Sequence, residues 1–78
     1  MTEDSFGQRL KKVLAERNMM QKELAEKIGV NEMAISRYIH GGRMVSVSIL
    51  IDICKALNVS ADYLLGLTEV MECQEKRQ

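Results

Sequence analysis

The chain has 78 residues and a formal net charge of zero, with 46% hydrophobic and 28% charged residues. This length gives room for one small domain and excludes most enzyme folds that enclose an active site. No apolar run reaches the ~18 residues that a membrane span needs. Because the start Met1-Thr2-Glu3-Asp4 is acidic and no apolar stretch follows it, we expect no signal peptide and a cytoplasmic protein.

The charges are distributed unevenly along the chain. Between residues 5 and 66 there are nine basic and six acidic residues, a net charge of +3, and the two ends together carry −3. A weakly basic body with acidic ends is compatible with a nucleic-acid partner.

Side chains that catalyse reactions or bind metals are scarce in this chain. Cys54, Cys73 and the single His40 cannot supply the four ligands of a zinc site without carboxylates. His40 has no Ser/Asp or Cys partner at a recognisable spacing, and there is no glycine-rich phosphate loop. We therefore expect no enzymatic activity, no metal or other cofactor, and no small-molecule ligand, and the cysteines are expected to be free thiols.

Apolar residues at helical spacing predict a first helix over residues 5–17, with Asn18 closing it in the left-handed conformation. A second helix is predicted over residues 21–28, and Gly29 ends it because glycine adopts a positive φ without a Cβ penalty. The inner face of this second helix carries Leu24, Ala25 and Ile28.

A third helix is predicted over residues 32–40, with Asn31 as its N-cap and Gly41-Gly42 as its stop. Its inward-pointing residues are Ile35, Tyr38 and Ile39. The second and third helices are short and joined by a tight turn, with the small Ala25 where they cross. The outer face of the third helix is then exposed and rigidly held, which fits the major groove of B-DNA, about 12 Å wide.

A fourth helix is predicted over residues 47–57 with Ser46 as N-cap, and a short fifth helix over residues 61–65 with Ser60 as cap. The fourth helix is apolar on most of its circumference, which indicates the central helix of a small bundle or a helix that also meets a partner. Its main stripe is Val47, Leu50, Ile51, Cys54 and Leu57, and Ile49 and Ile53 form a second stripe.

The predicted organisation is a flexible start at residues 1–4, one helical domain at residues 5–66 and a polar tail at residues 67–78. The predicted fold class is all-α, a compact bundle of about five helices. The tail is expected to be disordered or associated with a dimer, because its few hydrophobic residues provide only one apolar turn.

The sequence QKELAEKIGV at residues 21–30, followed by ISRYIHG at residues 35–41, resembles the phage-repressor and Cro-type helix-turn-helix family (lambda-repressor-like, XRE). The resemblance extends over about residues 5–67. It implies about five helices, a homodimer on a palindromic operator, and transcriptional repression by a stand-alone or prophage-derived regulator. Double-stranded DNA is then the expected partner, bound through the helix Glu32–Ile39.

Carried over by position, the resemblance implies DNA contacts at Gln21, Asn31, Glu32, Met33, Ser36, Arg37 and Arg43. Gln21 would donate to a phosphate, and Arg43 would reach the DNA backbone. Arg37 can bind guanine through a bidentate fork or grip a phosphate, Glu32 can accept from cytosine N4, and Met33 can pack on a thymine methyl. Asn31 and Ser36 are short and suit positioning on the backbone.

A homodimer of so short a chain must form through the fourth and fifth helices and the tail. The candidate contacts are Ile49, Tyr63, Leu64, Leu67, Val70 and Met71. Two recognition helices in such a dimer would lie about 34 Å apart, one turn of DNA.

The chain departs from the family pattern at two notable places. Leu14 and Ile39 stand where many members carry an arginine and a glutamate paired inside the fold. Replacing such a buried pair by hydrophobic residues is often neutral or stabilising. Met20 stands where the family usually has a threonine or serine as N-cap, which costs about 1 kcal/mol of local stability.

A protein-interaction module of the same fold is the alternative, such as an antitoxin or an anti-repressor that holds a toxin or another protein partner. The zero net charge, the acidic Glu32 on the groove-facing helix and the spare apolar surface of the fourth helix support it. A steep salt dependence of DNA binding distinguishes the two functions, since phosphate contacts release counterions.

Overall fold

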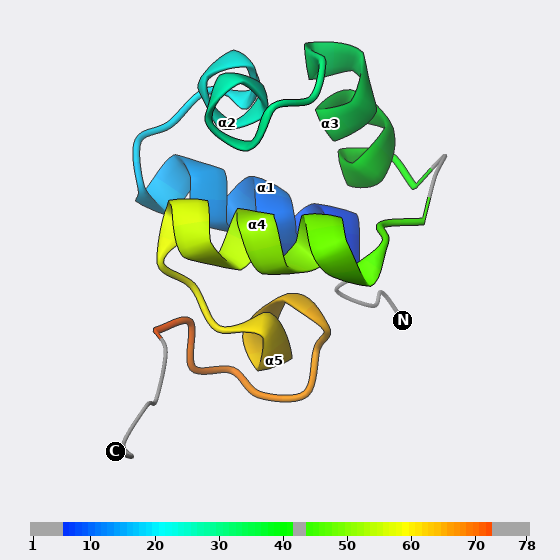
Figure 1. Cartoon of the computed structure of the whole chain (residues 1–78). Helices are drawn as coiled ribbons and strands as arrows, with labels where there is room; N and C mark the ends of the chain where they lie inside the picture. Colours follow the sequence, from blue (N-terminus) through cyan, green and yellow to red (C-terminus); the bar gives the residue numbers. More distant parts are fainter. Residues whose placement is uncertain (1–5, 42–43, 73–78) are drawn as a thin grey trace.

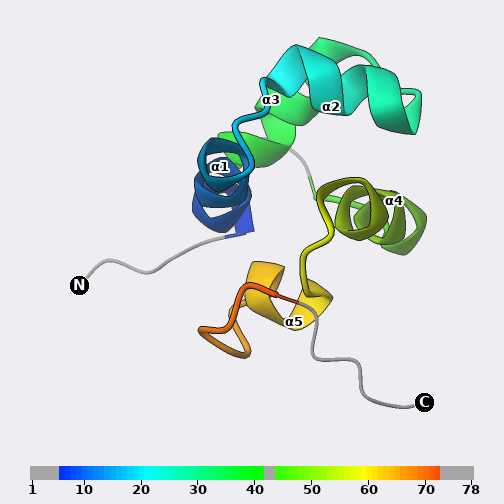
Figure 2. The same cartoon turned by 90° about the vertical axis from the view of Figure 1, so that its left-hand side faces the viewer.

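The computed structural model describes residues 6–41 and 44–72, and this part of the chain folds into five helices without a strand. The helices are α1 (Phe6–Glu16), α2 (Gln21–Ile28), α3 (Glu32–Ile39), α4 (Val47–Leu57) and α5 (Ala61–Leu64). They lie in three tiers: α2 and α3 at the top, α1 and α4 in the middle, and α5 with the following segment below (Figures 1 and 2). The all-α prediction is confirmed.

The helix boundaries follow from short polar side chains and left-handed residues. Asn31, Ser46 and Ser60 each accept a hydrogen bond from the backbone N–H three residues on, at 2.9, 3.2 and 3.3 Å respectively. Asn18 adopts a φ of 58° after α1, and Gly29 a φ of 77° after α2. These side-chain caps and left-handed ends are those that the sequence predicts.

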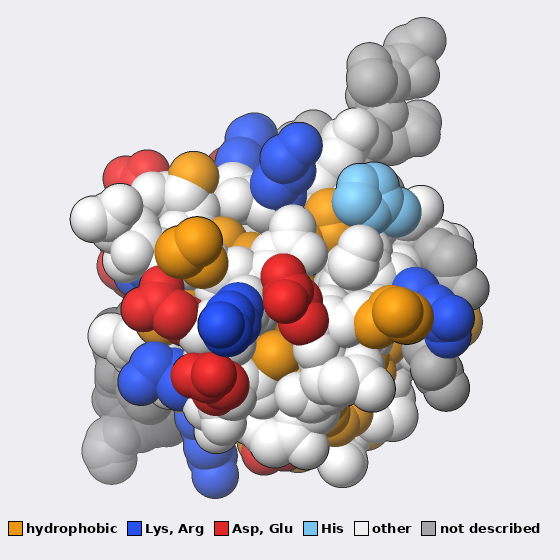
Figure 3. All heavy atoms as spheres, turned by 90° about the horizontal axis from the view of Figure 1, so that it is seen from above, with side chains coloured by type: hydrophobic (Ala, Val, Ile, Leu, Met, Phe, Trp, Pro, Cys, Tyr) orange, Lys and Arg blue, Asp and Glu red, His pale blue; other side chains and the backbone are white. Residues whose placement is uncertain are grey.

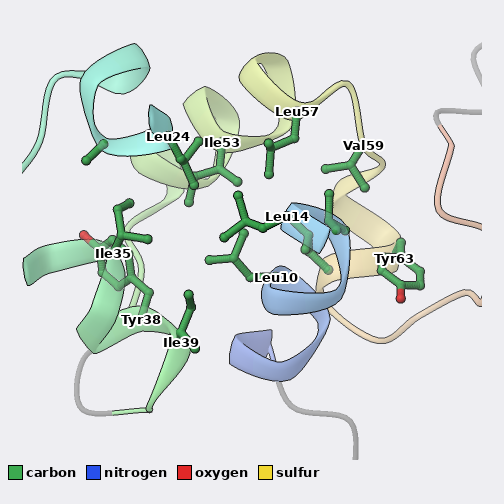
Figure 4. Close-up of a cluster of buried hydrophobic side chains, with 13 residues drawn as sticks. Leu10, Leu14, Leu24, Ile35, Tyr38, Ile39, Ile53, Leu57, Val59 and Tyr63 are labelled. Atoms are coloured by element: carbon green, nitrogen blue, oxygen red, sulfur yellow. The ribbon is translucent and has the colours of Figure 1, made fainter. Parts of the chain in front are cut away.

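The hydrophobic core lies between the tiers and receives side chains from every helix (Figure 4). Leu14 and Ile39, the apolar residues at the family's ion-pair positions, are both buried in it. The buried hydrophobic residues are Leu10, Val13, Leu14, Leu24, Ala25, Ile35, Tyr38, Ile39, Ile53, Leu57, Val59, Tyr63 and Leu64. No helix of the described ranges is long and apolar enough to span a membrane.

The buried face of α4 combines residues from both of its predicted apolar stripes. Val47 is 72% exposed and Ile51 is 48% exposed, whereas Ile53 from the second stripe is fully buried. Leu57 is buried as predicted. A helix that is apolar nearly all round carries no periodicity that selects its inner face, so the packing partners decide the rotation.

Arg9 of α1 attaches the C-terminal segment to the bundle, and Arg17, which follows α1, contacts the end of α4. Arg9 is buried, and its Nη1 donates to the backbone oxygens of Tyr63 and Thr68 at 3.1 and 3.2 Å. Its Nη2 donates to Glu69 Oε2 at 3.0 Å. Arg17 Nε donates to the backbone oxygen of Leu57 at 2.8 Å.

The segment after α5 also pairs with the start of that helix. The backbone N–H of Ser60 donates to the backbone oxygen of Met71 at 2.9 Å. Met71 is half-buried and packs against the core, whereas Leu67 is 73% exposed. Of the predicted tail at residues 67–78, the structure describes residues 67–72, and Met71 in this part contacts the bundle.

Met20 occupies the N-cap of α2 without making a side-chain cap. Its backbone is extended, with φ −90° and ψ 158°, but its side chain accepts no cap hydrogen bond. Met20 and Glu23 form a capping box in which the Met20 backbone N–H donates to Glu23 Oε1 at 2.8 Å, but Met20 itself offers only a thioether sulfur, a weak acceptor. The first turn of α2 therefore lacks the hydroxyl acceptor that a threonine or serine at this position would supply.

Replacing Met20 by serine is expected to raise the free energy of unfolding by about 1 kcal/mol, because the hydroxyl would accept a first-turn backbone N–H. Urea denaturation followed by circular dichroism measures this change. Met20→Ala is the matched control, since it removes the same exposed side chain without adding an acceptor. Equal stability of the two variants would contradict the missing-cap explanation.

Candidate nucleic-acid interface

Helices α2 and α3 form a helix-turn-helix whose turn is held by the backbone. The Val30 backbone N–H donates to the backbone oxygen of Ala25 at 3.0 Å, and Gly29 provides the left-handed residue between the helices. Ala25 is only 3% exposed, as expected for a small residue at the crossing. The orientation of α3 relative to α2 is therefore fixed by a short turn and a close helix contact.

Helix α3 is also fixed against α1. The backbone of α1 at Gly7 approaches the end of α3 so closely that a Cβ at this position would overlap the carbonyl oxygen of Ile39. The same Cβ would lie 2.8 Å from the carbonyl oxygen of Tyr38. Two helices thus support α3 from one side, and its opposite side faces outward.

The outward side of α3 carries most of the predicted DNA contacts. Glu32 and Arg37 are exposed, and Met33 is 62% exposed. Ser36 is half-buried, and the exposed Asn31 uses its side-chain oxygen to cap the helix. A carboxylate, a thioether, a hydroxyl and a guanidinium group therefore lie along one face of α3 that is accessible to a partner, next to the amide of the N-cap Asn31.

A surface hollow of about 490 Å³ is lined by residues of α1 and by the first residues of α2 and α3. Gln21 of α2 and Glu32 of α3 both line it, so the structure brings these two predicted contacts together. Lys11 and Lys22 line the same hollow, and they set two positive charges against the carboxylate of Glu32. The sequence pattern placed Lys11 on a solvated outer face of the first helix, and only the packing of α1 against α3 reveals its position at this hollow.

His40 is the C-cap residue of α3. His40 Nδ1 lies 3.0 Å from the backbone oxygen of Ser36, and because a carbonyl oxygen only accepts, Nδ1 is the donor. The side chain is exposed. Arg43, the predicted contact in the following loop, lies outside the described residues.

Viewed onto α2 and α3, the molecule has no uniform charge. Basic, acidic and hydrophobic side chains alternate there, and a histidine lies on the same face (Figure 3). Such a mixed surface provides the hydrogen-bond donors, acceptors and apolar groups that reading base edges requires. Within residues 6–41 and 44–72, no three His, Cys, Asp or Glu side chains gather as a metal site.

The predicted dimer contacts are divided between core and surface. Tyr63 and Leu64 are buried within the protomer, so their side chains are not available to a second copy. Ile49 and Met71 are half-buried, whereas Leu67 and Val70 are 73% and 41% exposed. The short fifth helix turns its aromatic side inward because Arg9 stacks on the ring of Tyr63, 4.8 Å from its centroid.

Comparison with known proteins identifies the family. A family model described as "Helix-turn-helix" matches residues 10–64. The regulator ImmR of Bacillus subtilis (strain 168) is 37% identical over 71 residues, which are 91% of this chain and 56% of that protein. The chain thus spans about half the length of ImmR. It is also 34% identical to the control protein C.BamHI of Bacillus amyloliquefaciens over 73 residues, which are 92% of this chain and 90% of that protein.

Among solved structures, the P22 c2 repressor in complex with a synthetic operator has a similar fold. Its TM-score is 0.78 at 28% sequence identity, and the match covers 86% of this chain and all of that one. The region that matches the family model, residues 10–64, includes α2, the turn and α3. The chain therefore belongs to the helix-turn-helix family, in the repressor and Cro-type group that its sequence resembles.

Proposed function

We propose that this protein is a sequence-specific, double-stranded DNA-binding transcriptional regulator, a repressor that acts in the cytoplasm without enzymatic activity. The observation that carries the proposal is the rigidly supported α3, whose exposed face presents Glu32, Met33 and Arg37. An α-helix with such a face fits the major groove. ImmR is a transcriptional regulator and the P22 c2 repressor binds an operator, and both similarities support the same function.

The side chains divide into base-reading and positioning groups. Arg37 donates to guanine, Glu32 accepts from cytosine N4 and Met33 packs on a thymine methyl. Gln21 at the start of α2 donates to a phosphate. Asn31, whose oxygen caps α3, retains its amide hydrogens as donors to the DNA backbone.

Selection from a random double-stranded DNA library tests this function. We expect an enriched palindrome whose binding constant falls steeply with salt, because each neutralised phosphate releases counterions. Weak binding with no enriched sequence would overturn the proposal and favour the protein-interaction module instead.

The operator-bound form is proposed to be a homodimer. Its interface is the surface patch formed by Leu65, Leu67 and Val70, which are 52%, 73% and 41% exposed. Arg9 supports this patch from below through its hydrogen bonds to Thr68 and Glu69. A two-fold arrangement would place two α3 helices about 34 Å apart, in successive major grooves.

Replacing Leu67 by glutamate is expected to convert the dimer to a monomer, because a charge on the patch would be buried without a partner. Sedimentation velocity measures the loss of the dimer, and binding to the selected palindrome should weaken more than 10-fold through loss of the second half-site. Leu67→Ala is the milder variant, and Ile51→Glu on α4 is the control for an added exposed acid. A dimer that survives Leu67→Glu but not Ile51→Glu would move the interface to α4.

A further inference from the structure

We propose that Lys11 and His40 form an additional phosphate-binding subsite for the DNA backbone, on the α1 side of α3. This subsite rests on the proposed DNA-binding function and extends it to a helix outside the helix-turn-helix. Its two side chains come from α1 and from the C-cap of α3, and they are not among the DNA contacts that the family resemblance implies.

The geometry of two neighbouring hollows carries the inference. A second hollow of about 340 Å³ lies between α1 and the end of α3, and its lining includes Gln8, Lys11, His40 and Gly41. Lys11 also lines the first hollow, with Gln21, Lys22 and Glu32. Lys11 is therefore the residue that the two hollows share, between the start of α2 and the end of α3.

This arrangement defines a path for one DNA strand. Gln21 is the proposed phosphate contact at one end of the path, and His40 and Gly41 lie at the other. A strand that follows both hollows passes over α1 at Lys11. Successive phosphates then meet a series of donors rather than two isolated ones.

The chemistry of the shared position suits a phosphate. Lys11 is exposed, and among the described residues no carboxylate pairs with its ammonium group. His40 uses Nδ1 to donate to Ser36, which leaves Nε2 as the ring nitrogen directed away from that bond. When the imidazole is protonated, Nε2–H donates to a phosphate oxygen beside the ammonium group.

The local charge balance favours the same ligand. Among the described residues, the first hollow is lined by Lys11 and Lys22 against one acid, Glu32, and the second by Lys11 and His40 without an acid. The whole chain has a formal net charge of zero, but the described residues along this path have a net positive charge from Lys11 and Lys22 against Glu32. An anion that spans several positions, such as a nucleic-acid strand, matches such a path better than a small ligand does.

Replacing Lys11 by glutamine tests the subsite on the selected palindrome and on a random duplex. We expect the slope of log K against log salt to become shallower by about 1, with a similar loss of affinity for both duplexes. The matched control is Lys12→Gln, which removes the same charge from the next residue, a side chain that lines neither hollow. Thermal melting checks that both variants keep the fold.

His40→Ala and the double variant Lys11→Gln/His40→Ala complete the test. Two donors to one phosphate give losses that are not additive, so the double variant should lose less affinity than the product of the two single losses. Identical salt slopes for Lys11→Gln, Lys12→Gln and the unmodified protein would overturn the subsite. That result differs from failure of the proposed function, in which the unmodified protein enriches no sequence at all.

Discussion

Replacing Gly7 by alanine is expected to lower the free energy of unfolding by about 3 kcal/mol, an overpacking cost at the upper end of the usual range. The added Cβ would overlap the carbonyl oxygen of Ile39 and lie 2.7 Å from its carbonyl carbon. These are backbone atoms, so no side chain can rotate to relieve the overlap. Helix α1 would have to move away from α3.

Helix propensity opposes this loss but is smaller. Alanine is favoured over glycine inside a helix by about 1 kcal/mol. The steric term therefore dominates, and Gly7→Ala should unfold at clearly lower urea concentration than the unmodified protein. Gln8→Ala, an exposed change at the next position, is the control and should stay within about 0.5 kcal/mol. Unchanged stability of Gly7→Ala would contradict the close contact of α1 with α3.

Replacing Arg37 by alanine is expected to reduce affinity for the selected operator about 10- to 100-fold, the range of a bidentate contact to guanine. Arg37 is exposed on α3 and its side chain is not part of the core, so the fold should keep its stability. Fluorescence anisotropy with the operator and with random DNA measures the loss on each. A loss confined to the operator identifies a base contact.

Arg37→Lys separates charge from geometry. Lysine keeps the positive charge but lacks the planar fork, so we expect the salt slope to be retained while discrimination at one base pair is lost. Equal losses on operator and random DNA for Arg37→Ala would instead assign the side chain to a phosphate. An unchanged operator affinity would contradict the proposed role of α3.

The sequence was sufficient to predict the features that local chemistry determines. The caps at Asn31, Ser46 and Ser60 and the left-handed ends at Asn18 and Gly29 all stand where short-range signals put them. These features need only a short side chain or a missing Cβ and a neighbouring backbone group. The exposed face of α3 was also predictable, because Ile35, Tyr38 and Ile39 lie on one side of the helix and were predicted to point inward.

Features that depend on packing between distant segments were not predictable. The sequence did not determine which face of α4 is buried, because this helix is apolar on most of its circumference; Val47 and Ile51 are exposed and Ile53 is buried. Tyr63 and Leu64 were predicted as dimer contacts, but both side chains are buried within the protomer, where Arg9 of α1 stacks on the Tyr63 ring. The position of Lys11 was not predictable for the same reason. It lies at a hollow lined by residues of α1, α2 and α3, which forms only when the three helices pack together.

The most direct measurement of the central claim is a map of the DNA-binding face. Amide chemical shifts of ¹⁵N-labelled protein would be followed by NMR during titration with the selected palindrome. We predict the largest changes at the start of α2, along Glu32–Arg37 of α3 and around Lys11, with small changes at Asp52 and Lys55 of α4. Changes concentrated on α4, with α3 unaffected, would contradict the claim that α3 reads the DNA.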